Sequence, residues 1–294
     1  MLSSPRSVRG VLLVATAALL WGCWPIFIRN AGMSSGATTL VALLVMAVPG
    51  PFVFRREWLA DRGATLALVG VGLGDAGNMA LYFAALARGP VTVGVLTHYL
   101  APLLVAVVAP FVTSEPRRWR ALWAAPVSLL GLALVLGPLD GPGSPLVTAG
   151  LGAGSALFYA VIVLSAKRAG RTYSPLGIAS LHAPISAVAV LAVLGRDAIP
   201  VALGPGALLL AVGAVLCGVV ASILFYRGLQ TIGAQAAGAL TYLEPVTAAA
   251  VGALAFAEPL SRGAWAGGAL VLAAGLFVAL EPPRPARIPR VATD

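Results

Sequence analysis

Five ionisable residues lie inside long apolar segments of the chain: Asp75, His98, His182, Arg227 and Glu244. A charged group at the centre of a lipid bilayer costs roughly 2.5–3.5 kcal/mol on insertion scales, so such residues are rare and commonly functional. Carboxyl and imidazole groups in such a setting can exchange protons or bind a cation. Asp75, His98 and Glu244 are therefore the candidates for proton exchange.

Glu244 stands about ten residues into its apolar segment, which is roughly 15 Å along a helix. It precedes Pro245, whose missing N–H leaves a carbonyl group without its helical partner. A carboxyl group beside such a break predicts a proton or cation site. The alternative is a carboxyl that stays protonated or that binds a neighbouring helix. Arg227 fits a partner in the same cavity as well as it fits a side chain that reaches the membrane interface.

Asp75, Asn78 and Tyr82 fall on one helical face, because they are spaced by three and four residues. This polar stripe on an otherwise apolar segment is expected to face a cavity. Hydrogen bonding to a neighbouring helix explains the stripe equally well. His182 stands alone before Pro184, and we expect it to form a structural hydrogen bond.

One pattern occurs twice in the chain, over residues 81–116 and again over 224–260. A constant offset aligns Tyr99 with Tyr242, the break-inducing Pro102 with Pro245, and Glu115 with Glu258. Each copy predicts an apolar helix, a tight turn, a second apolar helix broken by proline, and a Glu-Pro exit. An internal repeat in a hydrophobic chain is typical of a membrane protein with two related halves.

The composition assigns the chain to the membrane. Hydrophobic residues make up 60% of it and charged residues 10%, whereas soluble domains carry about 25% charged residues. Since a membrane span needs about 20 apolar residues, ten spans are predicted. Their approximate limits are 8–29, 36–54, 63–87, 91–113, 119–137, 146–166, 175–194, 205–229, 234–257 and 262–280. Cys23 and Cys217 both fall in spans, and we expect no disulfide.

The net charge of +9 does not indicate nucleic-acid binding, because the basic residues fall in short loops and tails. Most lie in alternate loops, and only Arg29, Arg88, Arg196 and Arg262 fall on the other side. The positive-inside rule then places both termini in the cytoplasm. Five helices in each copy is an odd number, so the copies must insert with opposite orientations. We expect an all-α membrane protein in which ten transmembrane helices form two inverted five-helix repeats around a central cavity.

The paired Tyr-Leu-x-Pro and Tyr-Leu-Glu-Pro elements, the small-residue runs and the Glu-Pro exits resemble the EamA-type domain of the drug/metabolite transporter superfamily. The resemblance implies a secondary transporter that moves small metabolites, amino acids or drugs by alternating access, usually as an exporter coupled to protons. It implies that the two tyrosine-containing elements reach the cavity from opposite halves. Glu115 and Glu258 look like framework residues.

The candidate cavity-lining residues are Trp21, Asp75, Asn78, Tyr82, His98, Tyr99, Tyr159, Arg227, Thr241 and Tyr242. A tyrosine in such a cavity can stack on a substrate ring or cation. Each tyrosine can equally be a core residue with a satisfied hydroxyl group. Two carboxyls, one arginine and several aromatics suit a zwitterion or an amphipathic cation better than a phosphate.

The expected organisation is a cytoplasmic tail at 1–7, a first repeat at 8–137, a linker at 138–145, a second repeat at 146–281, and a disordered cytoplasmic tail at 282–294. The expected location is a bacterial plasma membrane. We expect a small-molecule substrate, the lipid bilayer and protons as partners, with no cofactor, metal or nucleic acid. Two alternatives remain: an intramembrane enzyme, such as a protease using Ser155 and His182, and a passive channel.

Overall fold

The structure is a computed structural model and describes residues 5–88, 91–113, 115–138, 143–200, 204–257 and 260–280. Within these ranges the regular elements are helices. They are α1 (Pro5–Trp21), α2 (Trp24–Ile28), α3 (Ser35–Ala47), α4 (Gly50–Val53), α5 (Arg62–Arg88), α6 (Val91–His98), α7 (Ala101–Val112), α8 (Trp119–Leu136), α9 (Pro145–Ala169), α10 (Pro175–Leu194), α11 (Pro205–Gly213), α12 (Ala221–Ile232), α13 (Ala234–Leu240), α14 (Leu243–Phe256) and α15 (Arg262–Ala279). Short 3₁₀ turns cover Arg56–Ala60 and Gly195–Ala198, and a π-helical stretch over Ala214–Val220 joins α11 to α12.

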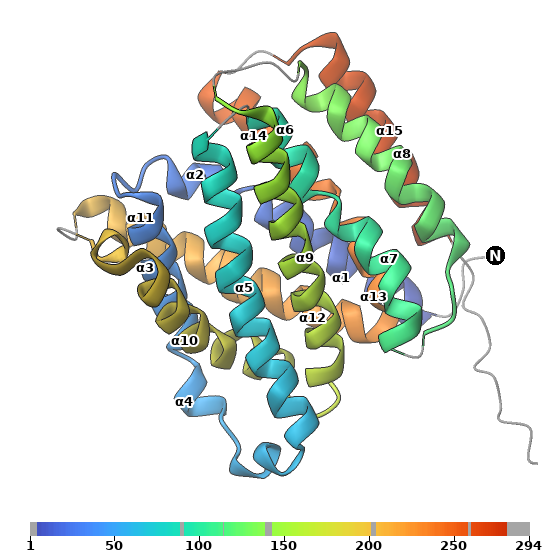
Figure 1. Cartoon of the computed structure of the whole chain (residues 1–294). Helices are drawn as coiled ribbons and strands as arrows, with labels where there is room; N and C mark the ends of the chain where they lie inside the picture. Colours follow the sequence, from blue (N-terminus) through green and yellow to red (C-terminus); the bar gives the residue numbers. More distant parts are fainter. Residues whose placement is uncertain are drawn as a thin grey trace, which may run out of the picture.

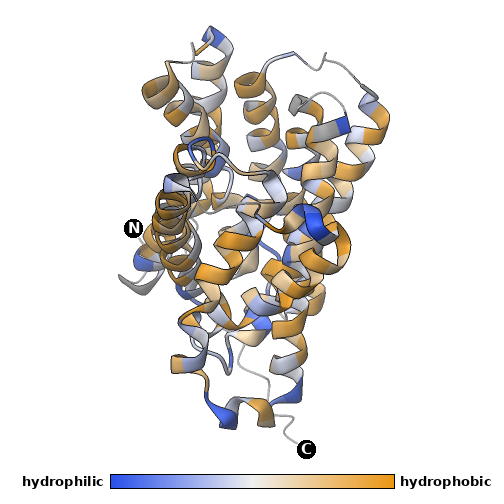
Figure 2. Ribbon diagram, turned by 90° about the vertical axis from the view of Figure 1, so that its left-hand side faces the viewer, coloured by the Kyte–Doolittle hydropathy of each residue, from blue (hydrophilic) through white to orange (hydrophobic). Residues whose placement is uncertain are grey.

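The helices confirm the all-α membrane fold and the ten predicted spans. Nine helical segments of the described chain are long and apolar enough to cross a bilayer, and Arg262–Val278 is a shorter tenth. Figure 2 shows hydrophobic residues along the lengths of the helices, with several of the most hydrophilic segments at helix ends. One boundary differs, because α1 begins at Pro5, inside the expected tail at 1–7. The expected disorder of 282–294 lies outside the described residues.

Serine caps explain where four of the spans begin. The side chains of Ser34, Ser144, Ser174 and Ser261 each accept a hydrogen bond from the backbone N–H three residues later. Such a cap satisfies one of the N–H groups that a helix start leaves without a partner. These caps allow the four helices to begin directly after short loops.

Four spans are interrupted near proline. The first breaks between α1 and α2 before Pro25, the second at Val48 and Pro49, the fourth at Tyr99 and Leu100, and the ninth at Thr241 and Tyr242. Pro102 and Pro245 follow the last two breaks and cannot donate to the carbonyl groups four residues earlier. The fourth and ninth spans are the matching elements of the two sequence repeats, so both repeats break at the same place.

The helix packing has the pattern that two inverted repeats produce. The third span packs on the sixth (α5 on α9), and the first packs on the eighth (α1 on α12). Exchanging the repeats turns one of these pairs into the other. The pairs α8–α15 and α3–α10 join equivalent spans and map onto themselves. The fourth and ninth spans are also equivalent, and they meet through α7 and α13. In Figure 1, α8 and α15 form one side of the molecule, and α5 and α9 cross its centre.

The α8–α15 pair supplies a test of this packing. A Cβ atom added to Gly131 of α8 would lie 2.8 Å from the Gly267 carbonyl oxygen of α15. We expect Gly131→Ala to destabilise the protein by about 1–3 kcal/mol through overpacking. Thermal unfolding in detergent should show a melting temperature lowered by at least about 2 °C.

Gly150 is the matched control, since a Cβ atom there meets nothing within 4 Å. Gly150→Ala should be neutral or stabilising through its better helix propensity. Equal effects of the two substitutions would contradict the close contact between α8 and α15.

Candidate functional site

The two broken spans meet at their breaks. The Tyr242 hydroxyl donates a hydrogen bond of 2.8 Å to the Tyr99 carbonyl oxygen, and these residues are 143 positions apart, which is the repeat offset. The two rings lie with their centroids 6.0 Å apart. Tyr242 thus links the same point of both repeats.

An aromatic cluster surrounds this junction, formed by Tyr82, His98, Tyr99 and Tyr159. The centroid of the His98 ring lies 4.4 Å from that of Tyr82, 5.1 Å from that of Tyr99 and 5.7 Å from that of Tyr159. The four residues come from three spans: α5, the α6–α7 span and α9. The sequence proposed all four, and the structure brings them together.

Glu244 lies against this aromatic cluster. Its carboxyl group is close enough to act electrostatically on the hydroxyls of Tyr82, Tyr99 and Tyr159. Glu244 is partly exposed, whereas Pro245 beside it is buried. A carboxyl group near several aromatic rings is chemistry suited to a cationic nitrogen.

Asp75 belongs to a second, neighbouring cluster. Its Oδ2 lies 3.8 Å from Nε2 of His182 on α10, and it also interacts with Tyr226 of α12. The His182 Nδ1 lies 2.7 Å from the Ile178 carbonyl oxygen. Because that carbonyl can only accept, Nδ1 carries the proton, which leaves Nε2 facing Asp75. The structural hydrogen bond expected of His182 is present, but its partnership with Asp75 was not predicted.

Asn78 lies between the two clusters on α5, one turn from Asp75 and one turn from Tyr82. Its side-chain Oδ1 is buried and has no hydrogen-bond partner among the described residues. A buried acceptor without a donor costs roughly 1–3 kcal/mol. Polar groups left unsatisfied in this way are often reserved for a ligand.

Three residues that were predicted to line the cavity have other surroundings in the structure. Arg227 is exposed on the face of α12 that carries Thr231, which agrees with the alternative that its side chain reaches the membrane interface. Its neighbours Phe225 and Tyr226 occupy the inward face of the helix instead. Thr241 and Tyr242 are each 1% exposed, and they line no open space in this conformation. Tyr242 is the core residue with a satisfied hydroxyl that the sequence left as the alternative.

Trp21 is partly exposed, and its ring packs 5.1 Å from that of Phe225. The neighbouring Gly22, at the break between α1 and α2, lies directly against α14. A Cβ atom on Gly22 would come within 2.7 Å of the Glu244 carbonyl oxygen. The break at Gly22 therefore lets α1 approach the start of α14.

The hydrogen bonds of Ser155 argue against nucleophilic catalysis. Ser155 contacts Nδ1 of His98 at 2.9 Å and donates to the Gly152 carbonyl at 2.8 Å. Since the hydroxyl proton points to Gly152, His98 must donate to Ser155, the opposite of a general base. Ser155 is also 0% exposed. The protease alternative, which paired Ser155 with His182, gains no support from this geometry.

The end of the bundle that carries Asp61, Glu115 and Lys167 is called the basic end below. There Glu115 accepts hydrogen bonds from the Ala234 N–H at 3.0 and 2.9 Å, and its Oε1 lies 3.2 Å from the Lys167 ammonium. Lys167 also donates to the Leu229 carbonyl at 2.9 Å. Glu115 follows α7 in the first half of the chain, and its partners lie in the second half.

Gln235 reinforces the same junction. Its Nε2 donates to the Pro116 carbonyl at 2.9 Å, and its Oε1 accepts from the Arg118 N–H at 2.8 Å. Gly233 allows the close approach, because it has φ +88° and an added Cβ would lie 2.7 Å from Glu115 Oε2. Glu258, the repeat equivalent of Glu115, lies outside the described residues.

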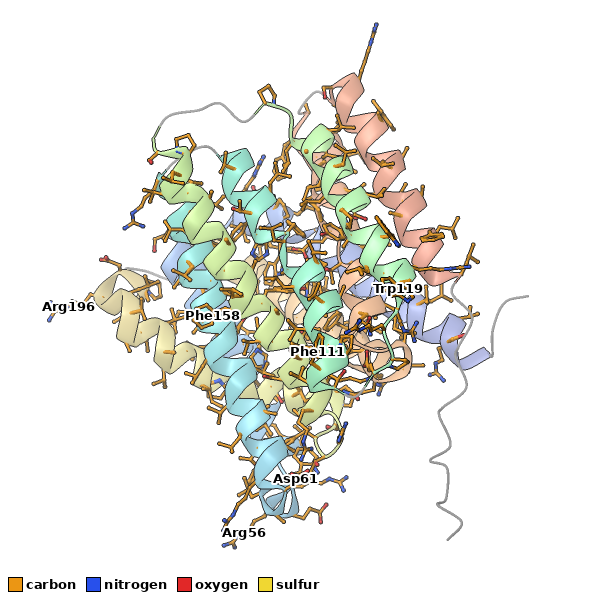
Figure 3. The ribbon with its side chains drawn as sticks, turned by 45° about the vertical axis from the view of Figure 1, so that its right-hand side comes forward. Arg56, Asp61, Phe111, Trp119, Phe158 and Arg196 are labelled. Atoms are coloured by element: carbon orange, nitrogen blue, oxygen red, sulfur yellow. The ribbon has the colours of Figure 1, made fainter. Side chains whose placement is uncertain are left out.

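A second ion pair crosses the basic end. Asp61 receives hydrogen bonds from Arg168 at 3.1 and 2.8 Å and from Thr172 at 2.7 Å. The Arg168 guanidinium, followed by Thr172, holds the pKa of Asp61 well below its usual range. In Figure 3 Asp61 and Arg56 lie together at one end of the bundle, away from Arg196.

No group of three or more His, Cys, Asp or Glu side chains that could hold a metal ion occurs in the described part of the chain. The chemistry available at the junction is therefore that of one carboxyl group, aromatic rings and hydroxyls. These groups are chemically suited to binding a cation and to exchanging protons.

Nine membrane-length helical segments and a shorter tenth in the described chain, with two equivalent broken spans that meet at an aromatic cluster, define a multi-pass membrane protein. The EamA-like transporter family model matches residues 8–137 and again 147–280. The chain therefore belongs to the EamA-like transporter family.

A solved structure described only as "Crystal structure of protein" is 21% identical to the chain, with a TM-score of 0.73. The match covers 95% of this chain and 98% of that one, and at this identity it shows the fold alone. No curated protein matches the chain.

The hydroxyl of Tyr242 gives a test of the junction. Tyr242→Phe keeps the ring but removes the donor to the Tyr99 carbonyl, and we expect a loss of about 0.5–1.5 kcal/mol in the free energy of unfolding. Tyr173→Phe is the comparison, because Thr65, the partner of Tyr173, also donates to the Asp61 carbonyl at 3.1 Å. Denaturation in detergent should show the larger loss for Tyr242→Phe. A larger loss for Tyr173→Phe would show that the Tyr242 hydroxyl does not link the two repeats.

Proposed function

We propose that the protein is a secondary active transporter of a bacterial plasma membrane. Its substrate is a small amine-containing metabolite, such as an amino acid or an amphipathic cation. The observation that carries this proposal is the Glu244 carboxyl, which lies within electrostatic range of the hydroxyls of Tyr82, Tyr99 and Tyr159 where the broken spans meet. An ammonium group would be attracted both by the charge of Glu244 and by the negative faces of the aromatic rings. Asn78 Oδ1, an acceptor without a donor, suits a further N–H of the substrate.

The packing favours alternating access between the repeats. All seven residues of α13 are buried, whereas in α14 only Pro245 and Gly252 are. No residue of α2 is buried, and residues 77–84 of α5 are all partly exposed. The half of the bundle toward the basic end is thus closed, and the opposite half is loosely packed. With both termini in the cytoplasm, as the basic residues favour, this is an outward-facing conformation.

Export against a proton gradient is the direction that we propose. Glu244 and the Asp75–His182 pair are the groups that would bind the proton, and His98 is the third candidate. Glu244 and Asp75 lie inside spans, where a carboxyl group that has lost its water is stabilised by a proton. A proton and a cationic substrate competing for Glu244 would couple their movements.

The first test of this function is uptake into sealed vesicles with the protein inserted, using a panel of amino acids, amphipathic amines and organic anions, with and without a pH gradient. We expect accumulation of an amine-containing compound that depends on the gradient. Glu244→Gln should abolish gradient-driven accumulation, because its side chain cannot take up the proton. Glu57→Gln is the control, since Glu57 is an exposed carboxylate at the basic end.

Gradient-driven transport that Glu244→Gln leaves intact would remove Glu244 from coupling. Accumulation of organic anions alone would contradict the substrate class. Release of chemically altered compounds would point to an enzyme instead.

The closed basic end gives a separate prediction. Glu115→Gln removes the charge that binds Lys167 and Ala234, and a charged hydrogen bond is worth about 1.5–3 kcal/mol. We expect the basic end to open at least roughly tenfold more often. A single cysteine at Ala237, which is 0% exposed, would report opening by its labelling rate with an impermeant maleimide, in a Cys23→Ser, Cys217→Ala background.

Asp61→Asn is the matched control. Asp61 also forms an ion pair between the two halves, but it joins α5 to α9, which pack on each other closely. Its loss should leave the labelling of position 237 unchanged. Equal labelling in the wild-type protein and Glu115→Gln would show that Glu115 does not control opening.

A further inference from the structure

A groove opens between α7 and α8 near the basic end, with a volume of about 220 Å³. Its walls are apolar and come from both helices: Ala106, Val107 and Pro110 on α7 and Leu122 on α8. Arg117 and Arg118, from the connection between the helices, complete the lining. The groove therefore has a hydrocarbon-like floor and a strongly basic mouth.

The groove lies on a membrane-facing surface. Its helices belong to the spans Val93–Val112 and Trp119–Leu136. Phe111 and Trp119 border the mouth with 71% and 52% exposure, and Figure 3 shows them near each other where α7 ends and α8 begins. Exposed aromatic residues at the end of a span are typical of the level of the lipid headgroups.

The chemistry of the mouth selects an anion. The Arg117 guanidinium lies 5.4 Å from the centroid of the Phe111 ring, so it sits over the groove's edge. Guanidinium groups bind phosphate oxygens in a bidentate manner. Basic pockets between spans at the cytoplasmic face commonly hold anionic lipid headgroups. A free phosphate would use the arginines but would leave the apolar walls unused.

We propose that this groove binds one anionic phospholipid, with its phosphate on Arg117 and Arg118 and an acyl chain along Ala106, Val107, Pro110 and Leu122. The occupant comes from the leaflet at the basic end. This assignment is separate from the substrate site at Glu244, since none of the lining residues belongs to the aromatic cluster.

The lipid would also stabilise the closed basic end. Gln235 lines the groove, and the same side chain ties α13 to the Pro116–Arg118 connection. An occupant that orders this connection favours the conformation in which Gln235 keeps both hydrogen bonds. This consequence rests on the proposed function, whereas the lipid site does not.

Native mass spectrometry of the full-length protein in detergent tests the site, with phosphatidylglycerol and phosphatidylcholine of identical acyl chains added as probes. We expect one phosphatidylglycerol to be retained in preference to phosphatidylcholine. The double variant Arg117→Gln/Arg118→Gln should lower its retention at least tenfold. Val107→Trp, which fills the groove from a 48% exposed position without changing charge, should lower it similarly.

Arg120→Gln is the matched control. Arg120 is next to the groove in sequence, but its guanidinium donates to the Phe277 carbonyl and lies over the Phe277 ring. The Arg120→Gln variant should retain the lipid as the wild-type protein does. Equal losses in Arg120→Gln and in the double variant would indicate general surface charge and overturn the site. Displacement of the lipid by inorganic phosphate at millimolar concentration, or unchanged retention in Val107→Trp, would overturn the role of the acyl chain. The lipid-retention experiment does not measure transport driven by a proton gradient. A negative result would therefore rule out the lipid site and leave the proposed function unaffected.

Discussion

Everything in this bundle depends on satisfying backbone polar groups where no water is available. A continuous helix satisfies them within itself, and a span broken by proline cannot. The chain breaks two equivalent spans at the same position and brings the breaks together, so that the Tyr242 hydroxyl satisfies the Tyr99 carbonyl. The breaks also fix the site, because His98, Tyr99 and Tyr242 lie at them and their rings pack together. Irregular backbone inside a membrane is tolerated where it is buried in protein, and that is where it lies here.

The two ends of the molecule differ in the kind of contact that holds them. At the basic end, charged and amide side chains from one half reach backbone groups of the other, as Glu115 does with Ala234 and Gln235 with Pro116. Toward the opposite end, α2 and α14 keep most of their surface partly exposed. Directional contacts of the first kind can be made and broken as a set, whereas close helix packing such as that of α8 on α15 resists separation.

The fold could be predicted almost completely from the sequence, since apolar length and proline positions are local signals. The ten spans and the break at Tyr99 follow from them. The cluster around His98 was predictable only in outline, because the repeat aligns Tyr99 with Tyr242 but does not say which ring is buried. Arg227 shows the limit: its position along the span was correct, but the face of α12 on which it lies depends on how α12 packs on α1. The pairing of Asp75 with His182, and the contact of Glu115 with Ala234, join residues far apart in the chain and needed the structure.

The link between Tyr242 and Tyr99 runs in one direction only. Under the repeat offset Glu244 aligns with Ala101, so the first half has no carboxyl group at the equivalent place. In a mirrored arrangement the Tyr99 hydroxyl would face the Tyr242 carbonyl, and Ala101 would stand where the present arrangement has Glu244. Two states related by exchanging the halves are consequently not isoenergetic. The asymmetry is located at a single carboxyl group, that of Glu244, which one half of the chain has and the other lacks.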